Sequence, residues 1–180
     1  MKFESGGARL VGRLFAPGRP RAAVLAHQVD DDQSDWFEFA GILASKGYTV
    51  LTFNFQGYCG GGGCSGGGLP TAELWTDIAA AVAFLEGRGA ERIGLIGASL
   101  GGEASIAAAA HLGSRVSAVA TLSASLGLAE IGLGDARRDA AAIRACAVRR
   151  RRVRCVGRRR RPCVLAVRWG AEAPGDPPVR

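Results

Sequence analysis

Apolar and polar residues group along the chain into segments that predict strands and helices in alternation. Short continuous apolar runs bounded by turn residues are typical of strands buried on both faces of a sheet. Runs with apolar residues three and four positions apart are typical of helices that pack on one side. The expected strands are Ala8–Phe15, Ala22–His27, Tyr48–Phe55, Arg92–Ala98 and Val116–Leu122. The expected helices are Asp35–Lys46, a helix capped by Thr71 that runs to about Glu86, Leu100–His111 and Asp135–Arg144.

This alternation predicts the fold class. Strands that alternate with helices along the chain favour an α/β fold with a mostly parallel sheet flanked by helices. One connection stands out, because Gln56–Pro70 is rich in glycine and therefore predicts an irregular loop. Its two cysteines, Cys59 and Cys64, have no further metal ligands near them in the sequence, and we expect free surface thiols there.

Charge divides the chain into two parts. The formal net charge is +7, yet residues 144–180 hold 12 arginines and two acids, while residues 1–143 are slightly acidic. The C-terminal part also lacks periodicity, so we expect one folded domain over 1–143, whose sheet ends at the strand 116–122, and a disordered tail over 144–180. Arginine blocks can bind phosphates, but the tail lacks the interleaved aromatic residues of a nucleic-acid-binding surface.

Composition also bears on metals and on location. Three cysteines, Cys146, Cys155 and Cys163, lie in the tail without the paired short spacings and histidines that a zinc site needs. No metal site is therefore expected. The first residues do not resemble a secretory signal, and no run approaches the roughly 20 apolar residues of a membrane span. We expect a cytoplasmic protein with no membrane partner.

One motif carries chemistry. Gly97-Ala98-Ser99-Leu100-Gly101 matches G-x-S-x-G, directly after the strand Arg92–Ala98 and at the start of the next helix, which is the setting of a nucleophile elbow. Glycines there allow a strained serine backbone and close approach of neighbouring chains. The Leu100 N–H at the helix N-terminus can donate to an oxyanion. The alternative, a dinucleotide-binding turn, needs glycines after the first strand, and His27–Asp30 has none.

Three segments together carry a family resemblance. They are Leu25-Ala26-His27-Gln28, Asn54-Phe55-Gln56-Gly57-Tyr58 and Gly97–Gly102. On these segments, the stretch from Ala22 to Gly127 resembles α/β-hydrolases of the dienelactone-hydrolase and serine-aminopeptidase-like kind. Such proteins usually have a His-Gly pair in the first segment and an Asp-x-Arg-Gly pattern in the second. This chain has Gln28 and Gln56 in place of the glycine and the arginine.

The resemblance implies a function. It suggests an esterase-like serine hydrolase that acts on an ester or related acyl bond of a small molecule, through an acyl-enzyme at Ser99 and without a cofactor. The backbone N–H of Gln28 or Val29 would join that of Leu100 in the oxyanion hole. His27 would be a structural residue of its loop, with a general-base role as the alternative. His111 lies twelve residues beyond Ser99 on one helix, or about 18 Å, and cannot take the serine proton.

The expected triad is incomplete in this sequence. On this fold the acid and the histidine follow the serine in chain order, and no histidine follows His111. We therefore expect impaired activity. The tail composition suggests a reading-frame change near Ala145, because a shifted frame there permits a strand followed by an acid. Two other functions stay open: a catalytically dead binding protein with this fold, or a basic nucleic-acid-binding protein acting through 144–180.

Overall fold

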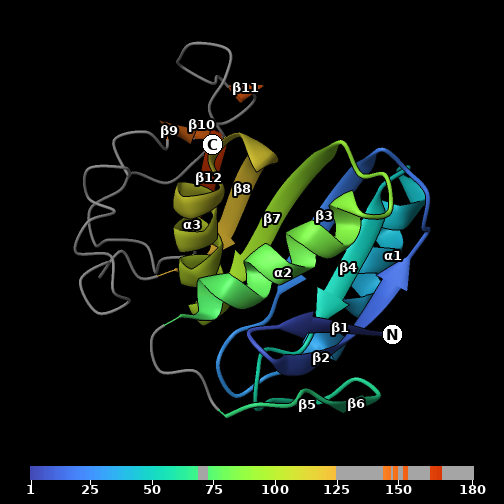
Figure 1. Cartoon of the computed structure of the whole chain (residues 1–180). Helices are drawn as coiled ribbons and strands as arrows, with labels where there is room; N and C mark the ends of the chain where they lie inside the picture. The colour runs from blue at the N-terminus through green and yellow to red at the C-terminus, as the bar shows by residue number, and fades with distance from the viewer. Residues whose placement is uncertain (69–72, 125–143, 147, 150–151, 154–162, 168–180) are drawn as a thin grey trace.

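An eight-stranded sheet organises the molecule, with the strand order β1-β2-β4-β3-β7-β8-β12-β9 (Figure 1). The computed structural model describes residues 1–68 and 73–124, and the backbone of four short strands after residue 143. The strands of the main sheet are β1 Lys2–Ser5, β2 Ala8–Phe15, β3 Arg21–Ala26, β4 Thr49–Phe53, β7 Arg92–Ala98, β8 Val116–Leu122, β9 Arg144–Cys146 and β12 Cys163–Val167. The helices are α1 Phe37–Ser45, α2 Leu74–Glu86 and α3 Leu100–Leu112, with the 3-10 helices η1 Gln33–Trp36 and η2 Gly113–Arg115.

The sheet is mostly parallel and has helices on both faces. Strands β4, β3, β7, β8 and β12 run parallel, whereas β1 and β2 add an antiparallel edge. Helices α2 and α3 cover one face and α1 lies against the other (Figure 1). The predicted α/β class with a mostly parallel, helix-flanked sheet is therefore confirmed.

The predicted elements of the described part are present with shifted ends. The helix expected from Asp35 begins as the 3-10 turn η1, because the Asp32 carboxylate accepts the backbone N–H of Ser34 at 2.7 Å and caps the turn. Strand β1 has no counterpart in the prediction, since four residues are too few to show a period. The expected cap Thr71 and residues 135–143 of the helix expected at Asp135–Arg144 lie outside the described residues.

The sheet continues beyond β8, where the sequence predicted that it would end. Strand β12 pairs in parallel with β8, from Cys163 opposite Ala118 to Val167 opposite Leu122, and β9 pairs with β12. A separate two-stranded pair is formed by β10 Val148–Arg149 and β11 Arg152–Val153. The run Cys163–Val167 is apolar throughout, which suits a central strand, but five residues among arginine blocks carry a weak local signal.

Two apolar cores hold the layers together. The larger one lies between the sheet and helices α2 and α3, and the smaller one joins Ala23, Leu25 and Val50 to Ala40 of α1. The larger core contains the fully buried Asp77 of α2. Its carboxylate accepts hydrogen bonds from the Ser5 hydroxyl at 2.6 Å, and from the backbone and side-chain amides of Gln56 at 3.0 and 2.8 Å. One acid thus ties together β1, the loop after β4, and α2.

The glycine-rich loop contains a short hairpin, β5 Cys59–Gly60 and β6 Gly63–Cys64 (Figure 1). Cys59 and Cys64 face each other across this hairpin, with Cα atoms 4.0 Å apart, and form a disulfide. The prediction of free thiols was therefore wrong. The glycines between the cysteines allow the chain to reverse, which brings residues five positions apart into direct contact.

No helix in the described part of the chain is both long enough and apolar enough to cross a membrane.

Candidate active site

Ser99 occupies a sharp turn between β7 and α3. Its backbone has φ 43° and ψ −114°, a conformation that is costly for any residue with a side chain. Two hydrogen bonds hold it there: the Ser99 N–H donates to the Leu122 carbonyl of β8 at 2.8 Å, and the Ser99 carbonyl accepts the N–H of Glu103 at 3.0 Å. The serine thus lies at the C-terminal end of a central strand and at the N-terminus of a helix.

Three glycines around the serine allow the elements to approach closely. A Cβ atom at Gly97 would lie 2.2 Å from the carbonyl oxygen of Gly101, and one at Gly101 would lie 2.4 Å from that of Ala26. At Gly102 the nearest contacts would be at 3.0 Å. The first two contacts are with backbone atoms, which cannot rotate away. These glycines therefore let the first turn of α3 sit directly against the ends of β7 and β3.

The same approach brings the loop after β3 beside the serine. Ala26 of β3 pairs with Gly97 of β7, so Gln28 follows its strand at the same level at which Ser99 follows β7. A cavity of about 180 Å³ opens at this end of the sheet, lined by His27, Gln28, Asp31, Asp35, Trp36 and Ala98. The structure thus places Gln28 on the wall of the same cavity as Ala98, the residue that precedes Ser99. Val29 does not line this cavity, and its side chain is 49% exposed.

His27 is fully engaged within its own loop. Its Nδ1 lies 2.7 Å from the Gln28 carbonyl, and its Nε2 accepts the backbone N–H of Phe55 at 3.2 Å. Nε2 is therefore the acceptor and Nδ1 carries the proton. The ring packs edge-on against Phe55 and Tyr58, and burial lowers its pKa. With both ring nitrogens occupied, His27 acts as a structural residue and has no lone pair free for the Ser99 proton.

The second histidine lies far from the serine. His111 is in the last turn of α3, where its ring stacks on Trp75 with centroids 4.0 Å apart. Neither histidine of the sequence is therefore placed to accept a proton from the Ser99 hydroxyl.

The acidic residues after His27 shape the loop. Asp32 caps η1, and the hydrogen bonds from Ser34 lower its pKa. Asp31 accepts a hydrogen bond from the Gln28 side chain. Partial desolvation, together with the charges of Asp31 and Asp32, raises the pKa of Asp35 at the cavity wall. The Gln28–Asp31 contact gives the unusual Gln28 a local role, which is to fix the loop that carries the expected oxyanion donor.

Asn54 is a structural residue of this site that the sequence did not single out. It is fully buried, and its Oδ1 accepts the Gln33 N–H at 2.8 Å. Its Nδ2 donates to the carbonyls of Gly60 and Gly63 at 2.8 and 3.0 Å. The sequence signals for Asn54 are its place directly after a buried strand and at the start of the segment Asn54–Tyr58 that carries part of the family resemblance. Among the described residues, no group of three His, Cys, Asp or Glu side chains could hold a metal ion.

A serine at a strand–helix turn, flanked by close-packed glycines at the carboxyl edge of a parallel sheet, defines the nucleophile elbow of the α/β-hydrolase class. The family model described as the alpha/beta hydrolase fold matches residues 14–144. The chain belongs to the α/β-hydrolase family.

Solved structures agree with this assignment. Epoxide hydrolase A of Mycobacterium thermoresistibile is 27% identical with a TM-score of 0.59, over 68% of this chain and 38% of that one. An esterase of Pyrococcus furiosus is 21% identical with a TM-score of 0.62, over 77% of this chain and 56% of that one. The bottromycin epimerase BotH is 27% identical with a TM-score of 0.53, over 69% and 48%. The chain therefore spans about two fifths to just over half of these proteins, and no curated protein matches it.

Proposed function

We propose that this chain is the nucleophile-bearing part of a serine hydrolase that forms an acyl-enzyme at Ser99 on an ester or related acyl bond of a small molecule. The observation that carries the proposal is the conformation of Ser99, at φ 43° between β7 and α3. Such a strained serine persists only where the surrounding structure enforces it, and strain of this kind concentrates at functional sites.

The proposed chemistry begins with attack by Ser99 Oγ on the acyl carbon. The carbonyl oxygen becomes an oxyanion as the C–O double bond opens, and the Leu100 N–H and the backbone N–H of Gln28 or Val29 would stabilise it. The alcohol then leaves with a proton and the acyl group stays on Ser99. Water later cleaves the ester, and no cofactor takes part.

Turnover by this chain is inferred to be slow. The sequence has two histidines; His27 uses both ring nitrogens within its loop and His111 lies at the far end of α3. Without a base the serine remains largely protonated, and loss of a triad member typically lowers the rate by several orders of magnitude. Oxyanion donors alone would leave a trace of acylation.

A fluorophosphonate probe tests the nucleophile without requiring turnover, because one covalent event is counted. We expect slow labelling of the Ser99 peptide in the folded chain during long incubation, because attack on phosphorus also requires loss of the serine proton, and no labelling of this peptide in Ser99→Ala under the same conditions. Ser114→Ala is the matched control, since Ser114 is an exposed serine beyond the end of α3. A folded chain that never labels at Ser99 would refute the proposal and favour a binding protein with this fold.

Substrate class needs a separate measurement. The solved relatives include esterases and epoxide hydrolases, so an activated ester and an aryl epoxide are offered in parallel. The acyl-enzyme proposal predicts that mass spectrometry finds the acyl group of the ester on Ser99. Modification by the epoxide alone would contradict an acyl-transfer function.

A further inference from the structure

We propose that Cys59 and Cys64 form a reversible thiol–disulfide site, and that reduction of this disulfide loosens the loop that carries the expected oxyanion donor. The part of the inference that concerns Ser99 rests on the function proposed above. The part that concerns the loop does not.

The disulfide is accessible to a reductant. Both cysteines are exposed, and they link the two strands at the base of the β5–β6 hairpin. A hairpin of two residue pairs is unstable by itself, and its inner positions are all glycine, which lose the most conformational freedom on ordering. The covalent link therefore adds a restraint to the backbone hydrogen bonds at the base of the hairpin, where the Ser65 N–H donates to the Tyr58 carbonyl at 2.9 Å.

The closed hairpin packs directly against the loop after β3. A Cβ atom placed on Gly60 would overlap the Asp32 carboxylate, and one on Gly61 would lie 2.5 Å from Cγ of Gln33. Such close approach means that the hairpin backbone lies in van der Waals contact with these side chains. Gln33 Nε2 also donates to the Gly61 carbonyl at 3.4 Å. Hairpin and loop thus share one packed interface.

Asn54 transmits this contact into the core. The buried side-chain amide of Asn54 donates to the carbonyls of Gly60 and Gly63 in the hairpin and accepts the backbone N–H of Gln33. If the hairpin opens, two of the three partners of Asn54 move, and the third anchors the segment that follows Asp31 and Gln28. Opening the hairpin therefore loosens the oxyanion side of the candidate site.

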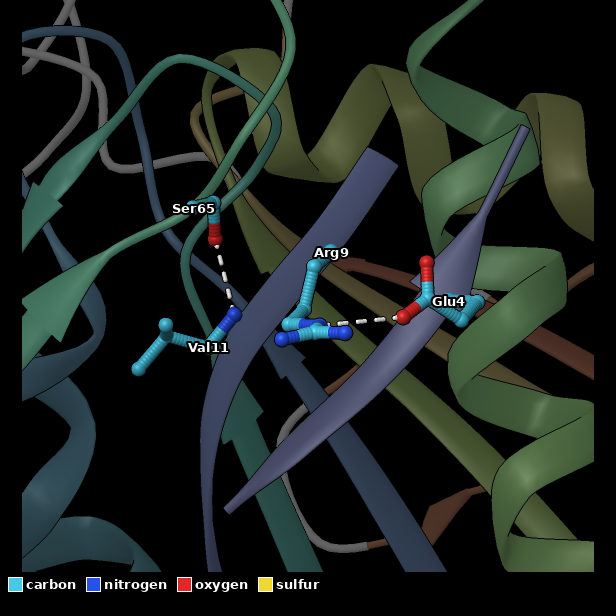
Figure 2. A network of polar contacts seen from close by, with 4 residues as sticks. All are labelled: Glu4, Arg9, Val11 and Ser65. Carbon is cyan, nitrogen blue, oxygen red and sulfur yellow. Dashed lines mark hydrogen bonds and ion pairs between the residues drawn. The ribbon is translucent and has the colours of Figure 1, made fainter. Parts of the chain in front are cut away.

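The exit of the hairpin is held separately. Ser65 follows Cys64, and its hydroxyl accepts the Val11 N–H of β2 at 2.9 Å (Figure 2). The same hydroxyl donates to the Asn54 carbonyl at 2.7 Å. Strand β2 is itself fixed to β1, where the Arg9 and Glu4 side chains are 3.2 Å apart (Figure 2). Opening is thus confined to the hairpin tip and the loop it touches, and the sheet stays intact.

The exchange reaction balances with a dithiol as the reductant. One thiolate of the dithiol attacks a hairpin sulfur, the S–S bond breaks, and the released cysteine thiolate takes a proton. The second thiol then attacks the mixed disulfide. This second attack oxidises the dithiol to a cyclic disulfide and reduces both cysteines, with two electrons and two protons transferred.

Peptide mapping first measures the redox state. Trypsin cuts after Lys46 and Arg88, so residues 47–88 form one peptide that contains Cys59 and Cys64 and no other cysteine. We expect this peptide to resist alkylation in the oxidised full chain and to take two alkyl groups after dithiothreitol. Two free thiols in a chain treated with oxidised glutathione would overturn the proposal.

Hydrogen exchange then measures the coupling to the loop. A disulfide that closes a ring of six residues is expected to lower the opening of the hairpin about 40-fold. Exchange at the Gln33 amide should therefore rise by up to that factor after reduction, while the Leu95 amide in β7 should not change. In the double variant Cys59→Ser/Cys64→Ser, the exchange rate at the Gln33 amide should equal that of the reduced chain and should not change when dithiothreitol is added. Equal exchange at Gln33 in the oxidised and reduced chain would overturn the proposal.

Fluorophosphonate labelling finally connects the loop to Ser99. Because a misplaced oxyanion donor costs at least about tenfold in rate, reduction should slow labelling by that factor or more. Faster exchange at Gln33 with unchanged labelling would overturn the link to the site. Absence of labelling in both redox states would refute the proposed function instead, and the Gln33 measurement would still decide whether the disulfide controls the loop.

Discussion

The substitution Gly101→Ala tests whether close packing at the elbow holds α3 against β3. The new Cβ would lie 2.4 Å from the Ala26 carbonyl oxygen and 2.5 Å from that of His27. Carbon–oxygen contacts need more than 3 Å, so the helix or the strand end must shift by about 0.7 Å or more. Both obstructing atoms belong to the backbone, and a side-chain rotation cannot relieve the overlap.

The magnitude follows from two opposing effects. Overpacking of this kind costs about 3 kcal/mol, at the upper end of the usual range, because the contacts are with main-chain atoms. Alanine in place of glycine inside a helix stabilises the folded state by about 1 kcal/mol through its higher helix propensity. The expected net loss is about 2 kcal/mol, which corresponds to a fall in Tm of about 4–8 °C for a chain of this length.

A matched control isolates the steric effect. Gly41 lies in the middle of α1, and a Cβ there would have no atom within 4 Å. Gly41→Ala should therefore raise stability by about 1 kcal/mol through helix propensity alone. Urea unfolding followed by circular dichroism compares the two variants with the parent. If Gly101→Ala were as stable as Gly41→Ala, the described contact between α3 and the end of β3 would be wrong.

Three further predictions concern buried and paired charges. Asp77→Asn should cost about 2 kcal/mol in urea unfolding, because one amide oxygen cannot accept all three hydrogen bonds and leaves a buried donor unpaired. Burial lowers the pKa of His27 from 6.5, so the folded state binds fewer protons at this residue than the unfolded state. The free energy of unfolding should therefore fall as pH drops below about 6.5. An NMR titration that finds the pKa of His27 above 6.5 would contradict this. The hydrogen bond from Arg115 lowers the pKa of Glu86 from 4.5, so its contribution to stability is full above about pH 4.5 and declines as pH falls further. Glu86→Gln should therefore cost less than about 1 kcal/mol at pH 7 and less at pH 3 than at pH 7, and an equal or larger cost at pH 3 in urea unfolding would contradict this.

Local patterns were enough to predict the parallel sheet and its helices. The strands β3, β4, β7 and β8 are short apolar runs bounded by turn residues, and the helices α1, α2 and α3 follow them as longer apolar segments, so no long-range information is needed. The elbow was predictable for the same reason, because strand, serine and helix are consecutive in the sequence. The Ser99 φ of 43° and the contact from Gly101 to Ala26 are the physical reasons for that glycine pattern.

Features that depend on distant residues were missed. The disulfide between Cys59 and Cys64 requires a chain reversal that glycines permit but do not specify. The role of Asn54 depends on Gln33 and on the hairpin, which come from two other loops. Strand β12 is recognisable only beside β8, since its five apolar residues lie in an arginine-rich region. The contacts of Asn54 with Gln33 and of β12 with β8 join segments far apart in the sequence, whereas the two cysteines are close in sequence and only the conformation of the glycines between them was not predictable.

The elbow is built entirely from neighbours within the described part of the chain. Ser99 is fixed by a hydrogen bond to Leu122, by the start of α3, and by the contact of Gly101 with the end of β3. None of these contacts involves a residue after β8. The conformation of Ser99 is therefore fixed by contacts within residues 22–122, whereas its activation as the proposed nucleophile would require a base, and neither histidine of the sequence is placed to act as one. Labelling of Ser99 and catalytic turnover are for this reason separable properties of the chain, and a chain that labels without turning over is the result that this division of the site predicts.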